Sequence, residues 1–481
     1  MPRPAPSNTD STDRDRRSRS IRYGGLVLLV AAGALRLAAA GGDLAIDEIW
    51  SWWLVKNAIG RLAEVASVRL DNNHIFNTVV IYALGPDVPG IWYRIPGVIA
   101  STATVWLGSR IAARRDPIAA GSTACFLIAG SYLMILYGTE ARGYTYLVLF
   151  ACLSWLCLLR AEAAGRRSDA IAFAASASLG FLAHLTFVYC YAGFMIWTAC
   201  KYRSPRFRTL LAAHVLPIAT AVSLYLFFIR GMEIGGGRKT TPLSGIVSTL
   251  SLIAGGPVSG DLASVAALGV AALIAWGLIR LWKQDRPLAT CYGTIIVLVP
   301  SAVLVSTGHS LVYPRYFLVP IAFALLVISD LIAGWWRSGR TGQLASLAVC
   351  GVYLVANGGW TVRLLDHGRG DYSRAIAWIA SQAQDRDQTV GSDHDFRNGM
   401  ILDYYAPRLG ASRLHYVDQE DVPRHGTDWM ILHDFDGDAA RPRAISDGYG
   451  NLYHLRGTFR HQSLTGFNWW LYRRAGTPNN P

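Results

Sequence analysis

The chain has 481 residues, of which 52% are hydrophobic and 16% are charged, and its mean hydropathy is +0.28. This composition excludes an ordinary soluble protein and indicates many membrane spans. The formal net charge of +13 comes mainly from arginines in short segments between apolar runs. That distribution is typical of membrane loops and does not indicate a nucleic-acid partner.

The polar N-terminal segment 1–22 is expected to form a disordered cytoplasmic tail. A bilayer-spanning helix needs about 20 apolar residues, and this criterion predicts a membrane module over residues 23–361 with about 11 transmembrane helices. The expected spans are 24–41, 92–112, 117–136, 144–160, 168–185, 186–200, 209–229, 262–281, 288–305, 315–333 and 343–361. The basic clusters then share the side of the N-terminal tail, which puts the N-terminus in the cytoplasm and the C-terminus outside.

The first external loop, residues 42–91, contains "LAIDEIWSWW", in which Asp47 and Glu48 precede three tryptophans. An acidic side chain near the end of a membrane helix must contact water or a cation, or take part in proton transfer, because its uncompensated burial is costly. In one interpretation Asp47 caps an in-plane helix whose tryptophans lie in the interfacial aromatic belt. In the other, which is compatible with it, Asp47 is a general base and Glu48 supports it or binds the acceptor.

The same loop carries "NNHIFNTVVIYALG", an apolar stretch too short to span a bilayer, which predicts an in-plane or re-entrant helix. Asn73 and His74 at its start have a helix-capping interpretation and a functional one, in which they bind acceptor or donor. Arg94 follows at the external end of the next span and is a candidate contact for a donor phosphate.

Two later external segments carry further candidates. "YGTEARGY" (137–144) holds Glu140 and Arg142, which either form an ion pair or, for Arg142, offer a planar fork of donors to a phosphate. "VYPRYF" (312–317) holds Tyr313 and Arg315, and Arg315 is either an interfacial anchor or a second phosphate contact. Glu140 and Tyr313 are candidates for binding acceptor or donor.

Residues 362–481 are polar, and an amphipathic helical pattern followed by short strands predicts a small extracytoplasmic α/β domain. Its "SDHDF" segment (392–396) has the Asp-x-Asp spacing that holds a metal in nucleotide-sugar enzymes, but nucleotide sugars are scarce outside the membrane. We therefore assign no metal ligand and no cofactor. The sequence leaves open whether a divalent cation assists.

The segments "DLAIDEIWSWW", "NNHIFNTVVIYALG", "WYRIPGVIAS", "YGTEARGYTYLVLF" and "YPRYFLVPIAFALL" occur in this order. Together they resemble the GT-C membrane glycosyltransferases, specifically bacterial relatives of the protein O-mannosyltransferases and of the lipid A aminoarabinose transferase (glycosyltransferase family 39-like). The resemblance implies a GT-C fold, Asp47 as the base, and a polyprenyl-phosphate sugar whose phosphate is held by basic residues. The family usually has His-Pro-Pro or Lys-Pro-Pro where this chain has His74-Ile75-Phe76.

The chemistry is consistent with that resemblance. A sugar on a lipid phosphate is already activated, so the protein needs one base and a cationic site for the leaving phosphate. We expect inverting transfer from a polyprenyl-phosphate donor to a hydroxyl of an envelope glycolipid, polysaccharide or protein. The expected location is the periplasmic face of a bacterial inner membrane.

Two other classes of protein are less consistent with the sequence. A transporter or flippase of lipid-linked sugars would have ionisable residues in mid-span, often with repeated halves, and the sequence has neither. A non-catalytic envelope assembly subunit would give no reason for acids and arginines to gather on one membrane face.

Overall fold

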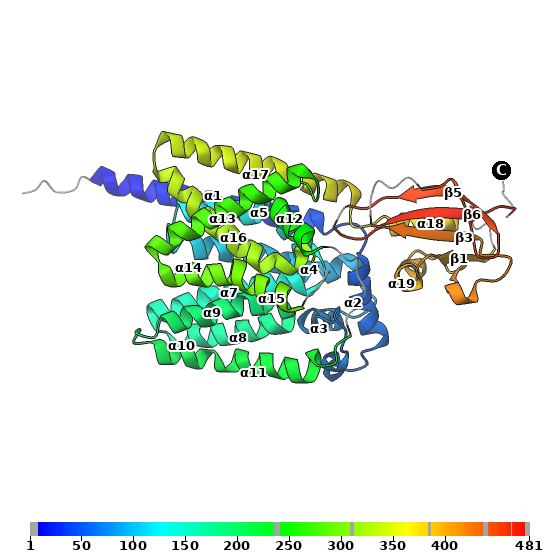
Figure 1. Ribbon diagram of the computed structural model, residues 1–481, viewed down its shortest axis with the longest axis horizontal. Coiled ribbons are helices and arrows are strands. Elements are labelled where there is room, and N and C mark those ends of the chain that lie inside the picture. The colour runs from blue at the N-terminus through cyan, green and yellow to red at the C-terminus, as the bar shows by residue number, and fades with distance from the viewer. Residues whose placement is uncertain are drawn as a thin grey trace, which may run out of the picture.

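The protein consists of a bundle of long, roughly parallel helices with a small sheet domain at one end (Figure 1). The computed structural model describes residues 8–233, 235, 241–307, 312–382, 386–435, 441–462 and 464–476. Two short helices, α2 (Ile46–Asn57) and α3 (Ile75–Leu84), lie at the end of the bundle that faces the sheet domain. We call this the domain-facing end.

The bundle is built from helices of very different lengths. They are α1 (Asn8–Ala39), α4 (Gly90–Ala112), α5 (Ala119–Gly130), α6 (Tyr132–Leu136), α7 (Gly143–Ala164), α8 (Arg167–Ala183), α9 (Val188–Cys200), α10 (Phe207–Ala213), α11 (Val215–Leu224), α12 (Pro242–Ile253), α13 (Asp261–Gln284), α14 (Arg286–Gly293), η5 (Thr294–Leu298), α15 (Val299–Thr307), α16 (Leu318–Arg337) and α17 (Arg340–His367). Among the described residues, six helices are long and apolar enough to cross a membrane, or seven if one bent pair counts as a span. The chain is therefore a multi-pass membrane protein.

The expected number of eleven spans is not confirmed. The span predicted at 117–136 is a helix pair bent by 64° between Gly130 and Tyr132, and the helices near 24–39 and 185–200 are shorter than 18 residues. Hydropathy counts apolar residues along the chain and is insensitive to where a helix breaks, so it does not by itself fix the number of continuous spans.

The N-terminal segment also differs from the expectation. Residues 8–22, predicted as part of a disordered tail, continue helix α1, whereas residues 1–7 lie outside the described ranges.

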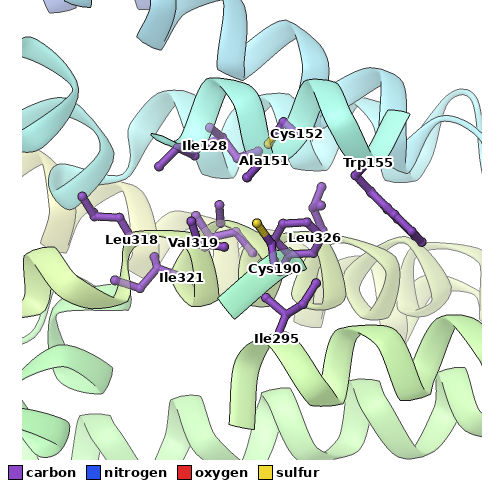
Figure 2. Packing of buried hydrophobic residues seen from close by; sticks show 14 of the residues in the cluster. Ile128, Ala151, Cys152, Trp155, Cys190, Ile295, Leu318, Val319, Ile321 and Leu326 are labelled. Atoms are coloured by element: carbon purple, nitrogen blue, oxygen red, sulfur yellow. The ribbon is translucent and has the colours of Figure 1, made fainter. Parts of the chain in front are cut away.

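The core of the bundle surrounds α16. In the most apolar 18-residue stretch of this span, 89% of the residues are buried. Figure 2 shows its side chains Val319 and Leu326 next to Cys190 of α9, with Cys152 of α7 above them in the view and Ile295 of η5 below. A Cβ at Gly277 of α13 would overlap the Val327 side chain of α16, so a glycine there allows close packing, as is usual between membrane helices.

The sheet domain contains six strands in the order β2-β1-β3-β6-β5-β4. They are β1 (Gln388–Ser392), β2 (Leu414–Tyr416), β3 (Trp429–Asp434), β4 (Ala444–Ser446), β5 (Leu452–Phe459) and β6 (Asn468–Arg474), with helices α18 (Tyr372–Ser381) and α19 (Asp395–Arg408). Strand β1 pairs parallel with β2 and β3, and the other pairs are antiparallel. The predicted C-terminal α/β fold is thus present, although α17 continues to His367, beyond the boundary predicted at residue 361.

Helix α2 joins the bundle to the sheet domain. Trp52 is only 2% exposed, and its ring meets that of Tyr404 on α19 edge-on with centroids 4.8 Å apart. The backbone N–H of Leu44 donates to the Tyr405 hydroxyl at 2.7 Å. The aromatic-belt interpretation is therefore wrong for Trp52, which packs against the domain.

Candidate active site

A cavity of about 300 Å³ opens at the domain-facing end of the bundle. Its wall combines Asp47 of α2, His74 at the start of α3, Arg142 before α7, and Tyr313 and Arg315 before α16. Together with Asn73, six candidate residues from four separate sequence segments thus line one cavity.

The centre of the cavity wall is a three-residue charge cluster. The Oδ2 atom of Asp47 lies 2.8 Å from Nη1 of Arg142 and 3.1 Å from Nη1 of Arg315. Burial alone would raise the pKa of the Asp47 carboxyl, but the positive charges of Arg142, Arg315 and Arg397 outweigh it and hold the pKa below its usual range. Asp47 is therefore ionised and occupies the position between the two arginines that an anionic ligand would take.

Asn72, which the sequence analysis did not select, orients this cluster. Its side-chain oxygen accepts a hydrogen bond from Nη2 of Arg142 at 2.9 Å, and its Nδ2 donates to the Asp47 carbonyl at 3.0 Å and to the Ser51 hydroxyl at 3.1 Å. Asn72 thereby ties the guanidinium to the first turn of α2. From the sequence only Asn73 was a candidate, because the spacing does not reveal which of the two adjacent asparagine side chains turns toward Arg142.

Asn73 has a structural role in this arrangement. Its Nδ2 donates to the carbonyls of Val65 and Val68, each at 2.7 Å, and its Oδ1 accepts from the Thr78 hydroxyl at 2.8 Å. It lines the cavity, but its side chain is committed to closing the turn before α3.

A ring cluster forms another part of the wall. His74 lies 4.7 Å from His184 and 5.5 Å from Tyr144, measured between ring centroids. Burial, together with His184 and the two arginines, lowers the pKa of His74 well below its ordinary value, so the ring is neutral. A Cβ at Gly143 would overlap the Ala183 carbonyl oxygen, so only glycine lets the start of α7 approach this ring cluster.

Glu48 does not line the cavity. Its carboxylate is fully buried, accepts a bidentate contact from Arg94 (Nε at 2.8 Å, Nη2 at 2.6 Å), and also accepts from the N–H groups of Ala45 (2.8 Å) and Ala141 (2.7 Å). Although burial opposes ionisation, Arg94 holds the Glu48 pKa below its usual range. Glu48 fixes the turn that carries Arg142 against α2, so its geometry fits support and leaves no oxygen for an acceptor.

Arg94 is committed in the same way. Besides Glu48, it donates to the carbonyls of Ala40, Gly41 and Gly42 at 3.0–3.2 Å and to Asp43 at 2.7 Å. With every guanidinium nitrogen engaged and no exposed surface, it has no donor for a phosphate, and we withdraw that interpretation.

The Glu48–Arg94 pair should dominate the stability of this end of the bundle. Glu48→Gln leaves the Arg94 charge buried without its counter-ion, and we expect it to lower the free energy of unfolding by about 3–5 kcal/mol. The measurement is the thermal unfolding midpoint in detergent. Glu64→Gln, which breaks an exposed pair with Arg61 in the same loop, should cost about 0–1 kcal/mol; equal midpoints for the two variants would contradict the assignment.

Glu140 also lies outside the cavity wall and connects the two parts of the protein. Its Oε1 is 3.6 Å from Nε of Arg369 and accepts from the Thr465 hydroxyl at 3.2 Å. Burial raises the pKa of Glu140, against the opposing charge of Arg369. Its position therefore indicates a role in docking the sheet domain and not in binding donor or acceptor.

No three His, Cys, Asp or Glu side chains converge as metal ligands would within the described part of the chain. We accordingly assign no residues to a divalent cation.

Solved structures with the same architecture show which class of fold this is. Over 95% of this chain and 99% of the other, it superposes with a TM-score of 0.54 and 14% identity on ArnT from Cupriavidus metallidurans bound to undecaprenyl phosphate. The apo state of the same protein matches with the same TM-score over 86% of this chain and 93% of that one.

An oligosaccharyltransferase from Archaeoglobus fulgidus in the apo form matches with a TM-score of 0.51 and 13% identity, over 80% of this chain and 64% of the other. No family model and no curated protein sequence matches. The chain has the GT-C glycosyltransferase fold, as the sequence resemblance implied.

Proposed function

We propose that this protein transfers a sugar from a polyprenyl-phosphate donor to an acceptor hydroxyl, with the cavity at Asp47, Arg142 and Arg315 as the active site. The observation that carries the proposal is the pairing of one carboxylate with two arginines in a cavity between membrane helices. The fold it shares with a protein solved with undecaprenyl phosphate supports the same class of donor.

Arg142 and Arg315 are proposed to bind the donor phosphate. Each has a buried Nε that makes no hydrogen bond to any described residue. Unsatisfied buried donors are rare in proteins, and a phosphate with several acceptor oxygens would supply their partners.

The prenyl chain has a suitable neighbouring space. An apolar cavity of about 320 Å³ lies between α12, α13, the η5–α15 segment and α16. It shares Leu304 and Phe317 with the wall of the charged cavity, so the two adjoin. We propose that the phosphate binds at the arginines while the first isoprene units occupy this apolar cavity.

The reaction follows from the competition between Asp47 and the phosphate for the same guanidinium groups. Donor binding draws the arginines toward the phosphate and leaves the Asp47 carboxylate less stabilised, which makes it a better proton acceptor. The acceptor oxygen then attacks the anomeric carbon, Asp47 takes the hydroxyl proton, and the carbon–oxygen bond to phosphate breaks with its electron pair leaving on the phosphate. Arg142 and Arg315 stabilise that charge, and the single displacement inverts the anomeric centre.

This competition predicts different pH profiles for kcat/KM and kcat. In the free protein the pKa of Asp47 is held low, so kcat/KM should remain flat from neutral pH to below the ordinary carboxyl range. In the donor complex the pKa of Asp47 rises, so the acid limb of kcat should lie at higher pH. Initial transfer rates across a pH series check this, and coincident acid limbs would contradict the competition.

The test of the function itself uses purified protein in nanodiscs with a polyprenyl-phosphate sugar and candidate hydroxyl acceptors from the cell envelope. The expected result is a glycosylated acceptor with inverted anomeric configuration and release of polyprenyl phosphate. The alternative, a flippase of lipid-linked sugars, predicts donor movement across liposomes without product. We propose the periplasmic face of the bacterial inner membrane as the location, with the sheet domain on that side.

A further inference from the structure

The sheet domain has a topological switch point of its own beside the proposed active site. After β1 the chain passes through α19 to β2 on one side of β1, whereas β3 pairs with β1 on the other side. The carboxyl ends of β1 and β3 therefore flank a topological switch point, the place where open α/β sheets bind ligands.

Three polar side chains meet at this point. Asp393 follows β1, and its Oδ1 accepts from Nδ1 of His433 at 2.8 Å; His433 lies near the end of β3. Nη1 of Arg397, in the first turns of α19, donates to Nε2 of His433 at 2.8 Å. The Asp393–His433 pair thus holds the Arg397 guanidinium, and the other nitrogens of Arg397 make no hydrogen bond to any described residue.

The switch point adjoins the charged cavity. Phe396, next to Arg397, meets the ring of Trp50 edge-on at 5.1 Å, and Trp50 lines the cavity. The charge of Arg397 also acts on Asp47 and on Tyr313, which both belong to the cavity wall. Arg397 therefore lies on the part of the sheet domain that packs against the cavity wall.

The Asp-x-Asp spacing in this segment is not a metal site. The Oδ1 of Asp395 accepts from the Tyr416 hydroxyl at 2.7 Å and its Oδ2 accepts from the N–H of Gln419 at 3.1 Å. Asp393 additionally accepts from Nδ2 of Asn398 at 3.1 Å. Both carboxylates are engaged by donors of the protein, whereas Arg397 keeps guanidinium nitrogens without a hydrogen bond to any described residue.

We propose that Arg397 at this switch point binds an anionic oxygen group of the acceptor, a phosphate or a carboxylate. An arginine presents a planar fork of donors that matches such groups, and here the partly exposed Asp393–His433 pair fixes one of its nitrogens. The acceptor hydroxyl would then lie over Asp47 while a charged group of the same molecule is held by the sheet domain. The identification of the ligand as the acceptor rests on the proposed function. The binding of an anion by Arg397 does not.

Binding can be tested without transfer. We expect inorganic phosphate to slow the phenylglyoxal modification of Arg397 several-fold in the full-length protein, reconstituted in phosphatidylcholine nanodiscs and read out residue by residue by mass spectrometry. Arg456, an exposed arginine on β5, is the internal control and should react at an unchanged rate. Repeating the experiment with acetate distinguishes phosphate from carboxylate, and an unchanged rate at Arg397 with both anions would overturn the proposal.

Transfer assays then identify the ligand as acceptor. Arg397→Gln should raise KM for a phosphate-bearing acceptor about tenfold or more, while KM for a neutral hydroxyl acceptor and for the donor stays unchanged, and Arg397→Lys should restore part of the effect. Arg456→Gln should change neither. Equal KM values for wild type and Arg397→Gln would overturn the acceptor role and leave the proposed function intact. Protection of Arg397 in a protein that transfers no sugar would leave the anion site intact and overturn the function.

Discussion

Asp47→Asn should transfer sugar about 10²–10⁴-fold more slowly than the wild-type protein, because the amide keeps the shape of the carboxyl but cannot accept a proton. The same variant should bind polyprenyl phosphate at least as tightly as wild type. The charge that competes for Arg142 and Arg315 is then gone, while both guanidinium groups remain. Opposite effects on rate and donor affinity separate a lost base from a misfolded protein.

The measurement is single-turnover transfer together with equilibrium binding of polyprenyl phosphate. Glu64→Gln is the matched control, since it neutralises a partly exposed carboxylate in the same loop and should leave both quantities unchanged. Equal transfer rates for wild type and Asp47→Asn would remove Asp47 as the base.

Arg142→Gln and Arg315→Gln should each lower kcat by about 10²–10³-fold, because each removes a cation that faces the charge developing on the leaving phosphate. A lost hydrogen bond to a charged group is worth about 1.5–3 kcal/mol, so polyprenyl phosphate should also bind about tenfold to a hundredfold more weakly. Arg142→Lys should recover only part of the activity, since an ammonium keeps the charge but loses the fork that also contacts Asn72.

The arginine variants carry an additional readout. Without Arg142, the pKa of Asp47 should rise, so the acid limb of kcat/KM should move to higher pH in Arg142→Gln. Arg61→Gln is the control, because Arg61 lies in the first loop, is 87% exposed and is remote from the cavity wall. An Arg142→Gln variant with wild-type donor affinity and an unshifted profile would contradict the phosphate role.

The sequence alone was sufficient for the class of fold, and it supplied most residues of the candidate site. Long apolar runs must become membrane helices because an unpaired backbone is costly in lipid, and this requirement acts locally along the chain. The abrupt change to polar residues after the last span likewise predicted the separate α/β domain. Charged side chains at the ends of membrane helices need a counter-charge or a functional role, and this requirement singled out Asp47, Arg142 and Arg315.

Other features depended on contacts between distant segments. Glu48 and Arg94 resembled cavity residues in sequence, yet they pair with each other at 2.6 Å inside the protein. Conversely, Asn72 has no sequence signal that separates it from Asn73, and its role follows only from the position of Arg142. A side chain's orientation within a turn is decided by the neighbours it meets, and those neighbours come from remote parts of the chain.

By itself, therefore, the sequence determined a multi-pass membrane protein with the GT-C pattern and a set of charged residues at one end of its helices. The tertiary structure decided which of those charges share the cavity and which are buried in ion pairs. It also brought Phe396 of the sheet domain, far away along the chain, into contact with Trp50 of the cavity wall. Hydropathy and capping act over a few residues, whereas charge pairing depends on distances that exist only after the helices have packed.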